Sequence, residues 1–112
     1  MSEALILALT TEANQEQAEA LARALLAQRL AACVALQPQR ALYWWEGRIE
    51  ASDEVQLLIK ARPEQREALE AAVRQHHSYA TPEFLCWPAE VSADYASWAR
   101  SVLSGGGSGR EP

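Results

Sequence analysis

The sequence predicts an α+β fold in which two helices cover one face of an antiparallel sheet. Apolar runs of strand length and amphipathic helical segments follow one another in the order β-α-β-β-α-β, with a short helix at the C-terminal end. The two middle strands are separated by two turn residues, which makes them a long hairpin, or β-ribbon. This order of elements is that of the split βαβ, or ferredoxin-like, arrangement.

Length and composition agree with one small folded unit. The chain has 112 residues, of which 49% are hydrophobic and 22% are charged, proportions typical of a protein with one modest core. We expect a single domain over residues 1–104. Residues 105–112, GGGSGREP, are rich in glycine and predict a flexible tail.

Charge and hydropathy narrow the classes of partner. The formal net charge of −5 disfavours nucleic acid and anionic lipid and favours cations. No apolar run approaches the ~20 residues that span a bilayer, and the start of the chain lacks the basic region of a secretory signal. Cys33 and Cys86 lie in apolar runs and form no CxxC pair, so we expect free thiols and a cytoplasmic location.

The N-terminal third predicts a strand followed by a helix. Residues 4–11, ALILALTT, are apolar on both faces and predict an interior strand. Asn14 is the expected N-cap of the next helix, with Gln17 as its partner in a capping box. Apolar residues recur at helical spacing through residues 18–29, and this stripe is expected to pack on the sheet.

The middle third predicts the hairpin and its register. Residues 29–36, RLAACVAL, predict a second buried strand, and Pro38 predicts a bulge or a break because it cannot donate to a sheet ladder. With Glu46–Gly47 as a two-residue turn, the strands have one expected register. It places Trp44 opposite Ile49, Leu42 opposite Ala51, and Arg40 opposite Asp53.

The alternation along the hairpin gives it one apolar and one polar face. Leu42, Trp44 and Ile49 share the apolar face at the end of the hairpin, and we call these three residues the tip patch. The opposite face carries aromatic, polar and charged side chains: Tyr43, Trp45, Arg48, Glu50, Ser52, Glu54, Gln56 and Lys60.

The length of the second strand makes the tip patch a candidate interface. Residues 30–45 would extend about 50 Å at ~3.3 Å per residue, whereas a domain of this size is only about 33 Å across. The hairpin therefore bends at Pro38 or projects beyond its sheet. We expect it to project and to bury its tip against another copy of the chain in a closed ring. The alternative is that it folds back and closes its own core.

The last third predicts a helix, a strand and a second short helix. Residues 61–77 predict a helix with Pro63 in its first turn. Residues 82–91 predict a strand in which Pro88 indicates an edge or a bulge. Ser92 is the expected cap of the last helix. The apolar side of that helix is expected to carry Tyr95, Trp98, Ala99 and Val102.

Four segments resemble one known family in order and spacing. They are RLAACVAL, LYWWEGRIEASDEVQLLIK, HHSYATPE and DYASWARSVL, and together they resemble the CutA divalent-cation tolerance proteins over roughly residues 5–103. The resemblance implies a cytoplasmic homotrimer of ferredoxin-like subunits with interlocked β-ribbons. It also implies a role in tolerance of copper and other divalent cations, with metal binding by some members of the family.

The resemblance also implies a candidate metal site. The bacterial members carry an HHPY motif, which stands here as His76–His77 followed by Ser78 and Tyr79. Glu54 aligns with an acid of the family. A cysteine that some members use for copper aligns with Thr10, a poor ligand for Cu(I). We therefore expect weak binding of Cu(II) or another divalent cation by His76, His77 and Glu54.

Each candidate residue also has a purely structural interpretation. His76 and His77 end a helix, where a positive charge is favourable, and Glu54 can be a solvated strand acid. Tyr43, Trp45, Lys60, Tyr79 and Glu83 are candidates for a cleft between subunits, together with Trp44 of the tip patch. Alternatively, Trp45 can form a cation–π pair with Arg48, and Glu83 can accept hydrogen bonds from backbone amides of a turn.

No arrangement of residues predicts catalysis. The chain has no GxSxG, Walker or GxGxxG motif, and its clustered glycines lie in the tail. We therefore expect a protein that is not an enzyme. Two alternatives to metal tolerance remain at this point. One is a trimeric signalling module similar to the PII proteins, with a small effector between subunits. The other is an assembly unit without a ligand.

Overall fold

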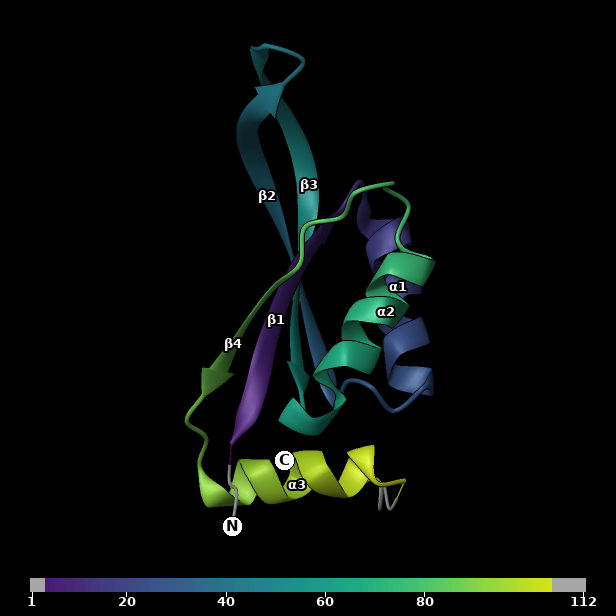
Figure 1. The fold of residues 1–112 in the computed structure, drawn as a ribbon, viewed down its shortest axis with the longest axis vertical. Helices are drawn as coiled ribbons and strands as arrows, with labels where there is room; N and C mark the ends of the chain where they lie inside the picture. The colour runs from purple at the N-terminus through teal and green to yellow at the C-terminus, as the bar shows by residue number, and fades with distance from the viewer. Residues whose placement is uncertain (1–3, 106–112) are drawn as a thin grey trace.

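The computed structural model describes residues 4–105 and confirms the ferredoxin-like order of elements (Figure 1). The sheet has the strand order β2-β3-β1-β4 and is antiparallel throughout. Helices α1 and α2 cover one face, and α3 lies across the lower end (Figure 1). The expected tail lies outside the described residues from residue 106 onward. The elements are β1 Leu5–Glu12, α1 Gln15–Ala27, β2 Cys33–Trp45, β3 Arg48–Ala61, a 3₁₀ turn Pro63–Gln65, α2 Arg66–His76, β4 Leu85–Ala89 and α3 Ala93–Leu103.

Helix α1 begins and ends where local chemistry satisfies its free backbone groups. The side chain of Asn14 accepts a hydrogen bond from the Gln17 amide at 2.8 Å, as expected for an N-cap. At the other end Arg29 adopts a left-handed conformation with φ 59°. The Leu30 amide then donates to the Leu25 carbonyl at 3.0 Å, which closes the helix end.

The core lies between the sheet and the two helices. Alternate residues of β3 face the helices, and Leu57, Ile59 and Ala61 have no exposed surface. The helix stripes that meet them are completely buried at Leu25 of α1 and Leu69 of α2. Burial of these side chains is the main favourable contribution to folding, at about 25 cal/mol per Å² of apolar surface.

The hairpin has the expected register, but Pro38 does not interrupt it. Trp44 pairs with Ile49, and the ladder runs without a break from Trp45–Arg48 to Cys33–Lys60. Glu46 and Gly47 have φ 50° and 78°, which is the geometry of a type I′ turn. The predicted bulge or break at Pro38 is wrong because β2 is an edge strand. An edge strand has a backbone side without a partner, where a missing N–H costs nothing.

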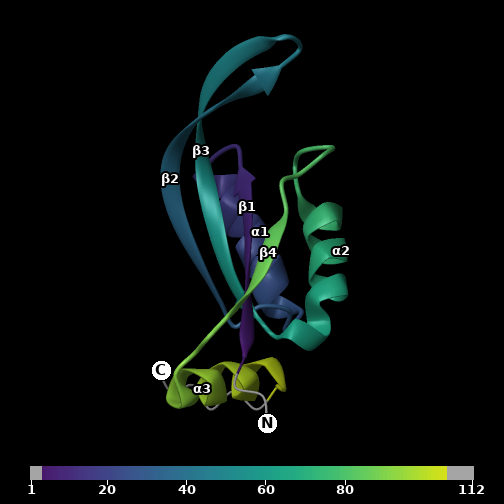
Figure 2. The ribbon, with the colours of Figure 1, turned by 60° about the vertical axis from the view of Figure 1, so that its left-hand side comes forward.

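The hairpin projects well beyond the sheet (Figures 1 and 2). The described chain measures 47 × 24 × 22 Å. The tip patch is uncovered, with Leu42, Trp44 and Ile49 exposed by 69%, 73% and 63%. The alternative in which the hairpin folds back to close its own core is therefore wrong for the single chain.

The C-terminal elements follow the prediction with two corrections. β4 covers only residues 85–89, although Pro88 lies at an edge as expected. In α3 the fully buried side is Ala96, Ala99 and Leu103, while the larger rings of the predicted stripe are only half-buried. Small residues allow α3 to approach the sheet end closely. Each helix within residues 4–105 is too short or too polar to cross a membrane.

Thr10 is an unsatisfied polar group in the core and yields a stability prediction. Its side chain is fully buried, and its hydroxyl has no hydrogen-bond partner among the described residues. Thr10→Val keeps the shape and removes the desolvated hydroxyl, so we expect the free energy of unfolding to rise by about 1 kcal/mol. Chemical denaturation measures this change. Thr10→Ser is the matched control, because it keeps the hydroxyl and loses a methyl group, and it should destabilise the protein. A gain in stability in Thr10→Ser but not in Thr10→Val would contradict the account.

Candidate functional site

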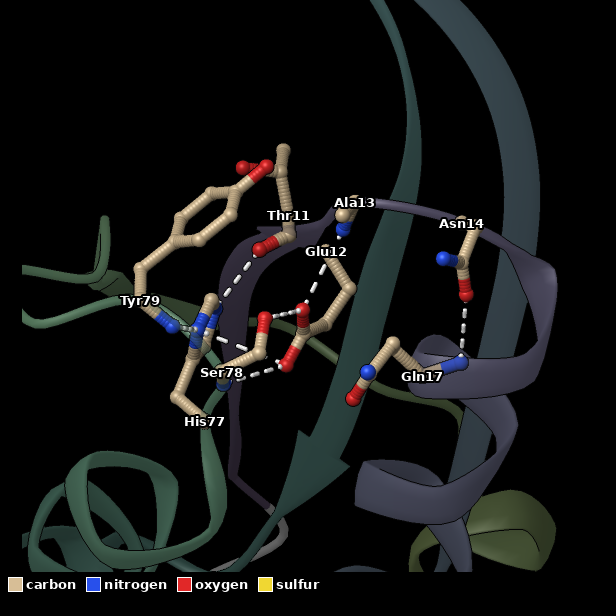
Figure 3. Close-up of polar contacts among 8 residues, drawn as sticks. All are labelled: Thr11, Glu12, Ala13, Asn14, Gln17, His77, Ser78 and Tyr79. Carbon is tan, nitrogen blue, oxygen red and sulfur yellow. Dashed lines mark hydrogen bonds and ion pairs between the residues drawn. The ribbon is translucent and has the colours of Figure 1, made fainter.

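A buried carboxylate at the end of β1 organises the loop that carries the HHSY segment. Glu12 has no exposed surface. Its side chain accepts hydrogen bonds from the Ser78 amide at 2.9 Å, the Ser78 hydroxyl at 2.5 Å and the Ala13 amide at 3.2 Å (Figure 3). Three donors offset much of the cost of burying a charged group. Glu12 thereby joins the end of β1 to the loop between α2 and β4.

The neighbouring His77 is held through both of its ring nitrogens (Figure 3). Its Nδ1 lies 3.0 Å from the Tyr79 amide, which can only donate. We therefore assign the proton to Nε2, which donates to the Thr11 carbonyl at 2.6 Å. The side chain is fully buried, with Nδ1 3.4 Å from the Glu12 carboxylate. In this state His77 has no free nitrogen to offer a metal ion.

The arrangement of Glu12, His77 and Ser78 does not match that of a catalytic triad. In a triad the serine bonds the imidazole, and the acid bonds the other side of the ring. Here the Ser78 hydroxyl bonds the carboxylate directly, and His77 Nε2 bonds a backbone carbonyl. The cluster therefore fastens the loop to the end of β1.

Tyr79 connects this loop to the base of the hairpin. Burial raises the pKa of Tyr79 above its ordinary value of 10.0, and the negative charges of Glu54 and Glu12 raise it further. Glu54 lies on β3 and accepts a hydrogen bond from the Gln39 side chain at 3.3 Å. The Tyr43 hydroxyl, another neighbour of Tyr79, lies 3.3 Å from the Ser52 hydroxyl. Two of the predicted cleft and metal residues, Tyr43 and Glu54, thus lie within electrostatic range of a third, Tyr79.

The other candidate residues lie apart from this group. His76 is exposed, and its Nε2 lies 3.1 Å from the side-chain nitrogen of Gln28. Lys60 is six residues from Glu54, or about 20 Å along an extended strand, and its Nζ lies 3.6 Å from the Cys33 sulfur. Glu83 is exposed.

At the hairpin tip, the polar face is also exposed. Tyr43 and Trp45 are exposed by 41% and 59%. Arg48, the expected cation partner of the Trp45 ring, forms an ion pair with Glu50 at 3.2 Å. Trp44 lies on the opposite face in the tip patch, so all three rings of the segment are open to solvent in the single chain.

The donor groups of residues 4–105 do not form a complete metal centre. No group of three or more histidine, cysteine, aspartate or glutamate residues within residues 4–105 is placed to hold an ion. Thr10, at the position of the family cysteine, is buried on the helix side of the sheet. Binding by His76, His77 and Glu54 stays a prediction. Such a site would need ligands from a second subunit or from the solvent.

Sequence reasoning missed Glu12, the most buried charged side chain of the site. The available signal was an acid directly after the apolar strand ALILALTT and before the helix cap Asn14. An acid in that place reads as the solvated end of a strand. Its burial depends on a loop 66 positions further along the chain, and no local pattern reveals such a contact.

The fold and this fastened loop define a small ferredoxin-like α+β protein with a projecting β-ribbon. A family model described as CutA1 divalent ion tolerance protein matches residues 6–102. The Divalent-cation tolerance protein CutA of Yersinia pestis (strain Pestoides F) is 42% identical over 100 residues, which are 88% of this chain and 84% of that protein. This chain belongs to the CutA1 divalent ion tolerance family.

Solved structures are similar over nearly the whole chain. CutA from Synechococcus elongatus PCC7942 has a TM-score of 0.87 at 37% identity, covering 91% of this chain and 92% of that chain. The protein described as periplasmic divalent cation tolerance protein CutA from Archaeoglobus fulgidus has a TM-score of 0.85 at 33% identity, covering 88% and 98%. The resemblance inferred from the four sequence segments is confirmed.

The buried carboxylate gives a prediction for stability. Glu12→Ala removes the common acceptor of two amides and a hydroxyl, so we expect the free energy of unfolding to fall by about 3 kcal/mol or more. Denaturant unfolding measures the loss. Glu19→Ala, an exposed acid on α1, is the control and should change stability by less than about 0.5 kcal/mol. Equal effects of the two changes would show that Glu12 does not fasten the loop.

The neighbours of Tyr79 give a prediction for its titration. Glu54→Gln removes a negative charge near the phenol, so the pKa of Tyr79 should fall toward 10.0. The ring signal of Tyr79 followed by NMR against pH measures this shift. Asp53→Asn is the control and should leave the pKa in place. An unchanged pKa of Tyr79 in Glu54→Gln would contradict the assigned influence of Glu54. Because the folded state holds the Tyr79 proton more tightly than the unfolded chain does, the free energy of unfolding should decrease as pH rises above about 10.

Proposed function

We propose that this protein contributes to tolerance of copper and other divalent cations as a homotrimer that binds the ions weakly. The observation that carries the proposal is membership of the CutA1 family, supported by 42% identity to a protein named for divalent-cation tolerance. The acidic net charge of −5 supports attraction of cations. Residues 4–105 place no three ligand side chains together, which supports weak binding with ligands contributed by more than one subunit.

Two uncovered apolar surfaces support the assembly. The tip patch is one of them. The other is the sheet face opposite α1 and α2, where Leu85 and Trp87 of β4 are exposed by 50% and 40%. The two surfaces are different, so contact between them joins copies head to tail. Such contacts close into a ring when the rotation between subunits allows it, and the family resemblance implies a ring of three.

The metal ligands of the proposal are exposed or lie near the hairpin base. His76 is exposed and its Nε2 contacts only a glutamine amide in the described structure. Glu54 lies near Tyr79 and next to the projecting part of the hairpin. An imidazole and a carboxylate suit Cu(II) or Zn(II) better than Cu(I). In this proposal His77 acts mainly through the position of the loop.

The proposal includes a role in binding rather than catalysis and a cytoplasmic location. The contacts of Ser78 support the first part, because its hydroxyl bonds a fully buried carboxylate that also holds two backbone amides and so serves to anchor the loop. The free thiols of Cys33 and Cys86 support the second part. Cell fractionation tests the location, and recovery of the protein outside the cytoplasmic fraction would overturn it.

Titration of the purified protein with Cu(II) tests the metal ligands. We expect weak, saturable binding by calorimetry, reduced about tenfold in His76→Ala and in Glu54→Gln because each removes one ligand. His77→Ala should mainly lower stability. Arg23→Gln is the control, because it changes an exposed side chain of α1. Affinity weaker than millimolar in the unchanged protein, or equal affinity in all variants, would refute the proposed ligand set.

Substitution in the tip patch tests the assembly. Trp44→Glu places a charge in the proposed contact, and burial of an unpaired charge is strongly unfavourable. We expect the variant to elute as a smaller species in size-exclusion chromatography. Arg23→Glu adds the same side chain to α1 and should leave the assembly intact. A trimer that persists in Trp44→Glu would exclude the tip patch from the interface.

A further inference from the structure

A cavity of about 240 Å³ lies between α2 and the loop that leads to β4. Glu70, Val73 and Arg74 of α2 form one wall, because residues at i, i+3 and i+4 share a helix face. The other walls come from the loop residues Ala80, Thr81, Pro82 and Phe84. The cavity is separate from the proposed metal ligands.

Arg74 is the uncompensated charge of this cavity. Within residues 4–105, every other arginine has an oxygen acceptor within 4.0 Å, whereas Arg74 has none. Helix dipole stabilisation is one purely structural role for a cation in the last turn of α2, but it does not account for the adjoining cavity. The paired arginines are Arg23, Arg29, Arg40, Arg48, Arg62, Arg66 and Arg100.

The acid of the cavity is already neutralised. The Glu70 carboxylate accepts a hydrogen bond from Arg66 at 2.8 Å. Arg66 also lies over the Phe84 ring, with 5.6 Å from the guanidinium carbon to the ring centroid. These contacts occupy Glu70 and leave Arg74 free. A ligand in the cavity therefore meets one unpaired guanidinium, the polar residue Thr81 and an apolar wall.

The apolar wall selects for a ligand with a hydrocarbon body. Pro82 and Phe84 are half-buried and line the cavity, so both can contact a ligand there. A volume of about 240 Å³ corresponds to about eight water molecules at ~30 Å³ each. This space suits a molecule of about seven non-hydrogen atoms.

We propose that this cavity binds a small organic carboxylate with a branched apolar body, whose carboxylate pairs with Arg74. A planar guanidinium matches a carboxylate through two parallel hydrogen bonds. The apolar body would lie against Pro82 and Phe84. This site is distinct from the metal ligands proposed above, so either proposal can be refuted without affecting the other.

NMR titration of the full-length protein with 3-methylbutanoate at constant ionic strength tests the proposal. We expect saturable amide shifts at Val73, Ala80 and Thr81, with a dissociation constant of about 1 mM, in the range for a ligand of this size. The neutral analogue 3-methylbutanamide has the same shape without the charge, and it should bind at least tenfold more weakly. Equal shifts with the two compounds would overturn the proposal.

Variants of Arg74 separate a specific site from general attraction to arginine. Arg74→Gln should weaken binding of 3-methylbutanoate at least tenfold, while Arg74→Lys should restore part of it. Arg23→Gln, an exposed helix arginine outside the cavity, is the matched control and should bind like the unchanged protein. Unaltered binding in Arg74→Gln, or shifts spread over the surface arginines, would overturn the proposal.

Discussion

The unbroken pairing of β2 with β3 is the constraint on which the rest of the structure depends. All 13 residues of β2 pair with β3 in one register. At the lower end this register places Leu57 and Ile59 against the helices, where they are fully buried. At the upper end the same alternation continues after the helices have ended. The tip patch is therefore a continuation of the core face of the sheet beyond the part that the helices cover.

The buried carboxylate of Glu12 is a second constraint, and it acts on the loop. The HHSY segment follows α2 without regular structure of its own, yet its backbone and side chains bond the end of β1. Removing one partner from such a network leaves the others desolvated and unpaired. This fastening holds Tyr79 near Glu54 of the hairpin, and the anchored loop continues directly into Ala80 and Thr81, which line the cavity beside Arg74. One anchoring network thus positions both candidate sites.

The parts of the fold that depend on local patterns could be predicted from the sequence. The hairpin register follows from a two-residue turn and strict alternation, and the start of α1 follows from Asn14. Pro38 was misread because its effect depends on whether its strand lies at a sheet edge, which pairing decides. The buried side of α3 was partly misread because small residues, rather than large rings, fit closely at the sheet end.

The site was less predictable than the fold, for a physical reason. Adjacent histidines suggested one metal site, yet His76 is exposed on the surface and His77 is buried at the end of β1. Neighbours in sequence at a helix end differ by about 100° around the axis, so their environments are unrelated. The buried position of Glu12 depends on a contact across most of the chain. Such contacts become visible only when the fold is known.

The central claim is that an exposed continuation of the core face is covered by another copy of the chain. Sedimentation equilibrium of the unmodified protein, repeated at decreasing concentration, tests this claim most directly. The account predicts a mass three times the 12.3 kDa of one chain, maintained on dilution. A folded 12.3 kDa species at all concentrations would contradict it.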